Sequence, residues 1–221
     1  MHRLFVIAGL WSAVFTGQEL TRCRAEEPDP AGFVPLFTGE SLAGWHGATE
    51  NYVLEEGLLK CRPQRGGNIY SDAEYADFEL RFEFRLTPGS NNGIGLRVPD
   101  DGHASTEGME IQILDDGHPK YAELKPYQAH GSVYGLIAAQ RGCLQPTGEW
   151  NTQTIRCVGR KITIECNGLT IVDGDLDTAT RDGTLDEKAH PGAARATGHL
   201  CFCTHGSEVD FRNLRIRSLS P

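Results

Sequence analysis

The chain has 221 residues and a formal net charge of −9, with 39% hydrophobic and 23% charged residues. This balance is typical of a globular domain rather than a disordered chain, and the length suits one domain with a sizeable core. The acidity argues against a nucleic-acid-binding protein, which would present a basic surface to phosphate groups. The 26 glycines and 11 prolines are spread along the sequence, which favours many short strands over long helices.

The N-terminal segment has the pattern of a secretory signal peptide over residues 1–25. Arg3 precedes an apolar run from Leu4 to Phe15, and Ala25 supplies the small residue at the exit. The run of twelve residues is shorter than the roughly 20 that a membrane-spanning helix needs. A buried N-terminal strand or helix is the alternative. We predict cleavage near Glu26 and a mature protein that is secreted or periplasmic.

Alternating apolar and polar residues predict strands along the rest of the chain. Asp77–Leu86 alternates over ten residues, with phenylalanines and leucines on one face and charged residues on the other. The same period recurs in residues 93–98, 109–113, 152–158, 161–166, 200–205 and 209–216. Residues 115–131 and 173–198 are polar and rich in glycine and proline, which predicts long loops. We therefore predict an all-β sandwich of two antiparallel sheets over residues 32–219.

Two local features refine this prediction. Gly159-Arg160 separates two strand patterns and predicts a two-residue hairpin turn, which would place Cys157 opposite Ile162. The alternation shifts phase between Phe211 and Leu214, which predicts a β-bulge.

Polar residues on the predicted strands are candidates for chemistry. Glu110 and Gln112 share a face because Met109 and Ile111 alternate with them. A carboxylate and an amide there could supply a base and a sugar-binding group, and Asp115 would join them only if the strand bulged or ended. Arg97 and His205 come from other strands. The alternative is an ordinary solvated face of an outer strand.

The cysteines give weaker signals. Cys201, Cys203 and His205 alternate on one strand face, but the outer two are ~13 Å apart, too far to share a zinc ion. Asp115-Asp116 and the set Asp173, Asp175 and Asp177 offer oxygen ligands to calcium, but neither has the full loop pattern of a calcium motif. For the second set, a solvated acidic turn is the favoured interpretation. Six of the seven cysteines lie beyond the predicted signal peptide, and we predict that most are buried small residues and that at most one disulfide forms.

A set of short motifs occurs in order along the chain. They are Phe37-Thr38-Gly39 with Gly44-Trp45, Tyr75-Ala76-Asp77-Phe78, Asn91-Asn92-Gly93-Ile94 with Arg97, Met109 to Asp115, Gly131 to Gly135, Gly148-Glu149-Trp150-Asn151, Asn167-Gly168, His205-Gly206, and Val209 to Asn213. With these motifs the chain resembles the secreted bacterial domains called 3-keto-disaccharide hydrolases, over about residues 32–219. The chain departs from that family at Cys203, where relatives usually carry glutamine.

The resemblance implies a concanavalin A-like jelly roll that cleaves disaccharides or glycosides oxidised at carbon 3 of one sugar. Its partner would be a carbohydrate, and a divalent cation is a candidate stabiliser of the enolate intermediate. Carried over by position, the resemblance implies two groups of site residues. The catalytic candidates are Glu110, His205 and Asp115. The substrate-binding candidates are Arg97, Gln112, Asn91, Tyr134 and Trp150.

Two rival functions belong to other classes. A non-catalytic carbohydrate-binding module on the same fold would keep aromatic platforms such as Trp45 or Trp150, and it would not need Glu110 and Asp115. A protein-interaction domain is the weaker alternative.

Overall fold

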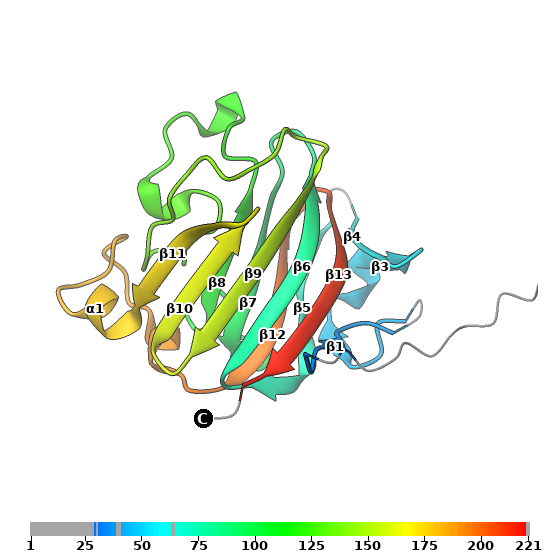
Figure 1. The fold of residues 1–221 in the computed structure, drawn as a ribbon, viewed down its shortest axis with the longest axis horizontal. Helices are drawn as coiled ribbons and strands as arrows, with labels where there is room; N and C mark the ends of the chain where they lie inside the picture. Colours follow the sequence, from blue (N-terminus) through cyan, green and yellow to red (C-terminus); the bar gives the residue numbers. More distant parts are fainter. Residues whose placement is uncertain (1–28, 30, 39–40, 63–64, 220–221) are drawn as a thin grey trace, which may run out of the picture.

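The computed structural model describes residues 29, 31–38, 41–62 and 65–219. Two antiparallel sheets pack face to face, and in Figure 1 the strands β9, β6 and β13 of one sheet overlie β7, β12 and β5 of the other. The predicted all-β sandwich is confirmed. The segment that carries the predicted signal peptide lies outside the described residues.

The eight-stranded sheet contains the alternating segments predicted at Asp77–Leu86 and at residues 209–216. In spatial order its strands are β11 (Leu169–Asp175), β10 (Lys161–Cys166), β9 (Trp150–Val158), β6 (Phe78–Leu86), β13 (Val209–Ser218), β4 (Leu58–Cys61) and β3 (Tyr52–Glu55), with β1 (Val34–Pro35) paired to β13.

The five-stranded sheet carries the candidate site. Its spatial order is β2 (Trp45–Gly47), β5 (Gly66–Tyr75), β12 (Gly198–His205), β7 (Asn91–Val98) and β8 (Met109–Leu114). The helical elements are short: α1 (Leu176–Thr180) and the 3₁₀ turns Thr49–Asn51, Pro119–Tyr121, Pro126–Gln128 and Pro191–Ala194.

The core forms between the two sheets because each strand turns one set of alternating side chains inward. Phe78, Leu80 and Phe84 of β6 are fully buried, as are Ile94 of β7 and Met109 of β8. The charged residues of β6 lie on the opposite face, which is the outer surface of the eight-stranded sheet. The strand pattern of the sequence therefore determines which side chains fill the core.

The two local predictions are also confirmed. Cys157 pairs with Ile162 across the β9–β10 hairpin. The pairing of β13 with β6 shifts register between Arg212 and Arg215, and Asn213 in that bulge has a φ of 53°.

The sequence patterns missed several strands, of which β5 matters most because it lies inside the five-stranded sheet. It begins with two glycines and alternates weakly, so its period was not evident. The predicted loop at 173–198 contains the one-turn helix α1, whose first turn is capped by the Asp175 carboxylate accepting a hydrogen bond from Thr178 N at 3.0 Å.

No helix in the described part of the chain is long and apolar enough to cross a membrane.

Candidate functional site

The outer face of the five-stranded sheet brings together most of the polar residues predicted from the sequence. Met109 and Ile111 of β8 are buried in the core, so Glu110 and Gln112 point to the other side of the sheet. On the adjacent strand β7, Gly95 pairs with Glu110 and Gly93 pairs with Gln112. Two glycines therefore form the floor of the face beside the carboxylate.

The Glu110 carboxylate lies over Gly93. A Cβ atom on Gly93 would overlap Oε1 of Glu110, so the space that a side chain would fill on β7 holds the carboxylate. The Glu110 side chain is only 8% exposed. Its Oε1 is buried and has no hydrogen-bond partner among the described residues. A buried carboxylate oxygen without a partner is costly, which marks this atom as one that a bound ligand would satisfy.

His205 lies beside this oxygen at the end of β12. Its Nε2 is 3.6 Å from Glu110 Oε1, and its side chain is 50% exposed. One member of this pair is therefore buried and the other reaches solvent. A carboxylate and an imidazole placed side by side are residue types that can serve as a general base and a general acid.

Side-chain amides line the face around the pair. Gln112 Nε2 donates a hydrogen bond of 2.6 Å to Asn91 Oδ1, so the two predicted binding residues lie together. Asn68 of β5 donates from Nδ2 to the Tyr70 hydroxyl at 3.1 Å, and Asn68 pairs with Cys203 across β12. The sequence analysis missed Asn68 and Tyr70 because it missed β5.

The loop of residues 99–107 forms one wall of the face. The Tyr70 hydroxyl donates to Gly102 O at 3.0 Å, and Ala104 packs into a small apolar cluster with Tyr70 and Cys201. This loop covers the part of the sheet that lies beyond Gly95. The Cys203 side chain belongs to the same cluster and is buried.

A histidine ties this wall to the sheet. His46 of β2 bonds Asp72 through Nδ1 and Asp100 through Nε2, each at 2.8 Å. The hydrogen bond to Asp72, together with that to Asp100, raises the pKa of His46 above its ordinary value. Because protonated histidine donates from both nitrogens, the tie is complete when His46 is charged.

The other wall carries two tyrosines. Residues 131–134 run along the free edge of β8, with Tyr134 N donating to Glu110 O at 2.9 Å. Tyr134 therefore lies next to Glu110, and its ring meets that of Tyr127 edge-on at 5.7 Å. Gln128 Nε2 donates to the Tyr134 hydroxyl at 3.3 Å and fixes the ring. We call the region of the outer face over Glu110, Gly93 and His205, flanked by residues 99–107 and 131–134, the groove.

The structure separates Asp115 from the groove. Its Oδ2 accepts a hydrogen bond from Gly89 N at 2.7 Å, and its Oδ1 accepts one from Thr147 Oγ1 at 3.3 Å. The carboxylate thus holds the turn between β6 and β7 and a neighbouring loop. Five residues along an antiparallel strand also separate it from Glu110 by about 17 Å. The Asp115 carboxylate therefore stabilises two loops, and it does not contact Glu110.

Arg97 also lies away from the groove. Its side chain is 1% exposed, and its guanidinium donates to Ala76 O, Gly159 O, Arg195 O and Asp77 Oδ1. The residue has a φ of 50° in a bulge opposite β12, which turns its side chain off the outer face. The guanidinium joins loops at one end of the sandwich instead of binding a substrate in the groove.

Trp150 belongs to the other sheet. Its ring lies under two guanidinium groups on the outer face of the eight-stranded sheet, Arg212 at 3.9 Å and Arg85 at 4.9 Å. Sequence alternation could not tell which sheet β9 would join, and the structure does not bring Trp150 together with Glu110.

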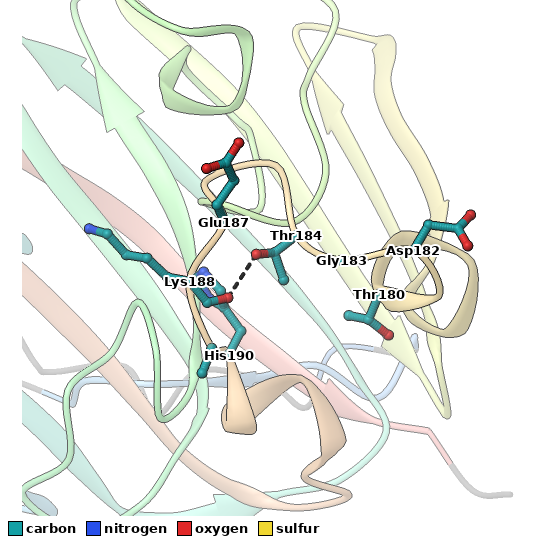
Figure 2. A pocket seen from close by; sticks show the side chains of 8 residues that line it. Thr180, Asp182, Gly183, Thr184, Glu187, Lys188 and His190 are labelled. Atoms are coloured by element: carbon teal, nitrogen blue, oxygen red, sulfur yellow. Dashed lines mark hydrogen bonds between the residues drawn. The ribbon is translucent and has the colours of Figure 1, made fainter.

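Two hollows lie elsewhere on the surface. One, of about 400 Å³, is lined by eight residues between Thr180 and His190. In Figure 2 the charged ends of Asp182, Glu187 and Lys188 point in different directions, so they do not converge on one ligand. The other, of about 390 Å³, is lined in part by Arg97, Arg160 and Arg195. Their guanidinium groups are already bonded to protein acceptors.

A divalent cation finds few protein ligands in the groove. Glu110 Oε1 and His205 Nε2 are its carboxylate and imidazole donors, and a resident zinc site needs three or four such ligands. The one group of three close metal-capable side chains among the described residues lies elsewhere: His130, Cys143 and Cys166. The groove therefore offers fewer carboxylate and imidazole donors than a zinc ion held by the protein alone needs.

Comparison with known proteins places the chain in a family. Residues 32–217 match the profile described as a 3-keto-alpha-glucoside-1,2-lyase-like domain. A 3-keto-disaccharide hydrolase of Bacteroides thetaiotaomicron is 24% identical, covering 86% of this chain and 80% of that protein. A Parabacteroides distasonis crystal structure, provisionally named a glycosyl hydrolase, is 31% identical with a TM-score of 0.76, covering 85% of this chain and 99% of its own.

A more distant structure shares only the fold. The carbohydrate-binding module CBM66 of Bacillus subtilis superposes with a TM-score of 0.56 at 12% identity, covering 83% of this chain and 100% of that module. The profile match extends over most of the chain and includes every strand that lines the groove. This chain therefore belongs to the family of 3-keto-alpha-glucoside-1,2-lyase-like domains.

Proposed function

We propose that the protein cleaves the glycosidic bond of 3-keto-disaccharides or 3-keto-glucosides, with Glu110 as the base. The proposal rests on the family and on one observation above all. Glu110 Oε1 is a buried carboxylate oxygen with no hydrogen-bond partner among the described residues, and it lies over the space left by Gly93.

The chemistry starts from the acidity that a ketone gives its neighbours. A ketone at carbon 3 acidifies the proton on carbon 2, so a positioned carboxylate can remove it. The electron pair forms an enolate, which reforms the ketone while a carbon 1–carbon 2 double bond forms and the aglycone leaves from carbon 1. Water then adds at carbon 1, and the net reaction is hydrolysis.

Glu110 suits the first step because of where its charge lies. The carboxylate is 8% exposed and its Oε1 has no hydrogen-bond partner among the described residues, so this oxygen can accept the carbon 2 proton. Gly93 leaves the space that the carboxylate occupies, since no side chain rises from β7 at this point. The position of the Glu110 carboxylate thus depends on the glycine beneath it.

His205 suits the second step. Its Nε2 lies 3.6 Å from Glu110 Oε1, and half of its side chain is in contact with solvent. A protonated His205 can donate a proton to the departing oxygen of the aglycone, and exchange with solvent can restore it. The amides of Gln112 and Asn68 are placed to bind sugar hydroxyls or the ketone oxygen.

A non-catalytic carbohydrate-binding module is the second candidate, but neither Trp45 nor Trp150, the tryptophans expected as its platforms, lies in the groove. Trp45 is buried, with its ring stacked on Phe37 at 4.8 Å. Trp150 lies on the other sheet under Arg85 and Arg212. The aromatic residues near Glu110 are Tyr134 and Tyr127, which could flank a sugar in an enzyme as well as in a binding module.

The test is aglycone release from a chromogenic 3-keto-glucoside, with the matched unoxidised glucoside as the control. We expect release from the keto substrate alone, because only its carbon 2 proton is acidic. Binding of both glucosides without turnover would favour the binding module. A parallel assay with a chelator shows whether a cation takes part, since loss of turnover would assign enolate stabilisation to a metal bound with the substrate.

A further inference from the structure

We propose that Cys143 and Cys166 form a disulfide that fastens the loop between β8 and β9 to the end of β10. The two cysteines belong to a buried cluster with His130, in which the sulfur atoms and a ring nitrogen all lie within 4.8 Å of one another. A disulfide has a sulfur–sulfur distance of about 2.05 Å, so the sulfurs need to approach by at most about 2.8 Å. The groove does not use this cluster.

The backbone around the two cysteines is already fixed. Asn167, the residue after Cys166, donates from Nδ2 to Cys143 O at 2.8 Å. Asn167 Oδ1 accepts from Thr152 N at 2.9 Å, so the same side chain is anchored on β9. The loop that carries Cys143 is thereby held against the end of the strand that carries Cys166. A disulfide here would require the side chains of Cys143 and Cys166 to move, with little rearrangement of the backbone.

A metal would compete for the same three side chains, but the hydrogen bonds of His130 oppose it. His130 Nδ1 accepts from Leu114 N at 3.3 Å, so the ring proton lies on Nε2, which bonds Gln153 Oε1 at 3.0 Å. Nε2 is also the ring nitrogen 3.9 Å from Cys166 Sγ. A metal on Nε2 would force the proton onto Nδ1, where it would meet the Leu114 N–H. The donor set therefore favours a cross-link over a metal.

The other close pair of cysteines is less suited to bonding. Cys201 and Cys203 have sulfur atoms 3.5 Å apart, but they are alternate residues of β12. Their Cα atoms are about 6.8 Å apart on an extended strand, at the limit for a disulfide. β12 is paired on both sides, with β5 and β7, so its backbone cannot shorten that distance.

The chemistry requires a disulfide donor such as glutathione disulfide. Cys143, which is 7% exposed, attacks as a thiolate. Its sulfur bonds to one donor sulfur while the donor disulfide breaks and releases one thiolate. Cys166 then attacks the Cys143 sulfur, forms the protein disulfide and releases the second donor thiol. Two electrons pass to the donor, and the two cysteine protons end on the two released thiols.

The electrostatics agree with this order of attack. A hydrogen bond from the Cys166 thiol lowers the pKa of Cys143, whereas that interaction and burial raise the pKa of Cys166. The more exposed sulfur is therefore also the more readily ionised one, as the attacking thiol should be.

Peptide mapping tests the proposal directly. The protein is equilibrated in glutathione buffer set to an oxidising poise, denatured without reductant, alkylated and digested. We expect a peptide pair linked through Cys143 and Cys166, while Cys61, Cys157, Cys201 and Cys203 carry the alkylating group. Alkylation of both Cys143 and Cys166 under these conditions would overturn the proposal. The buffer sets the redox poise, so the result does not depend on where the protein resides.

A stability measurement adds a second readout. The cross-link closes a loop of the 24 residues 143–166, so reductant should lower the Tm by on the order of 5–10 °C. The double variant Cys143→Ser/Cys166→Ser should lose this response to reductant, and the control Cys157→Ser, at another buried cysteine, should keep it. Stoichiometric zinc that disappears in Cys143→Ser would assign the cluster to a metal and overturn the disulfide.

Discussion

Gly93 on β7 and Glu110 on β8 share one volume of space: a Cβ atom on Gly93 would overlap the carboxylate oxygen Oε1 of Glu110. The glycine is in a strand, and its backbone does not require the left-handed conformation that usually explains a glycine. Its role is to make room. The position of the candidate base thus depends on an absent side chain on the neighbouring strand.

The substitution Gly93→Ala tests this dependence. The new methyl group should push the Glu110 carboxylate away from its place, and a displacement of about 1 Å can cost on the order of 100-fold in rate. We expect turnover of a 3-keto-glucoside to fall by 10- to 100-fold with a small change in Tm. The measurement is kcat and KM together with a thermal melt.

Gly117→Ala is the matched control. Gly117 lies in an exposed turn, where a Cβ atom would meet nothing within 4 Å. This variant should keep normal turnover and a normal Tm. If Gly93→Ala also turned over normally, the carboxylate would not need its present place, and the assignment of Glu110 would lose its geometric basis.

Arg97→Met tests the architectural role of the buried arginine. The change leaves Asp77 and three carbonyl oxygens without their donor, and breaking such a buried ion pair costs roughly 3–5 kcal/mol in the free energy of unfolding. Each kcal/mol corresponds to about 2–4 °C in Tm for a chain of this size. We expect a large fall in Tm and an unchanged KM. A raised KM at an unchanged Tm would instead indicate that Arg97 binds the substrate.

Trp150→Ala tests whether the outer face of the eight-stranded sheet takes part in activity. Its two cation–π contacts with Arg85 and Arg212 are each worth about 0.5–1 kcal/mol. The variant should therefore lose a few degrees in Tm and keep the kcat and KM of the parent protein. Loss of sugar binding without loss of Tm would place a carbohydrate site on the outer face of the eight-stranded sheet.

His130 makes stability depend on pH. Burial lowers the pKa of His130 to about 4, whereas the unfolded chain titrates near 6.5. A histidine with a lowered folded pKa favours the folded state fully above pH 6.5, and this contribution is lost as the pH falls from 6.5 to about 4. The loss approaches about 3 kcal/mol.

Urea unfolding at several pH values measures this effect. The difference in unfolding free energy between the parent protein and His130→Gln should shrink as the pH falls through this window. A difference that stays constant from pH 7 to pH 4 would mean that His130 is protonated in the folded protein as readily as in the unfolded chain.

The groove could be predicted only in part, because alternation gives the face of a residue but not its neighbours. Met109 and Ile111 are apolar, and this alone forces Glu110 and Gln112 outward. The same alternation on β12 predicts that His205 lies on the outer face. Their proximity to one another depends on the order of strands in the sheet, which no local pattern contains.

The misplaced residues have specific physical causes. Arg97 lies in a bulge that turns it off the face its alternation predicts, and Asp115 lies past the point where β8 ends. Trp150 lies on a strand whose pattern fits either sheet. Asn68 was missed because β5 begins with glycines and carries polar residues on its outer face, so it lacked the apolar period that marks a strand.

The variant Glu110→Gln tests the central claim most directly, because it removes the charge of the base and keeps the shape of the side chain. Loss of a positioned general base costs 10²–10⁴-fold in rate, and a groove-facing residue contributes little to folding. We predict that turnover of a 3-keto-glucoside falls by 10²–10⁴-fold while the Tm stays within a few degrees of the parent. Near-normal turnover at an unchanged Tm would contradict the account.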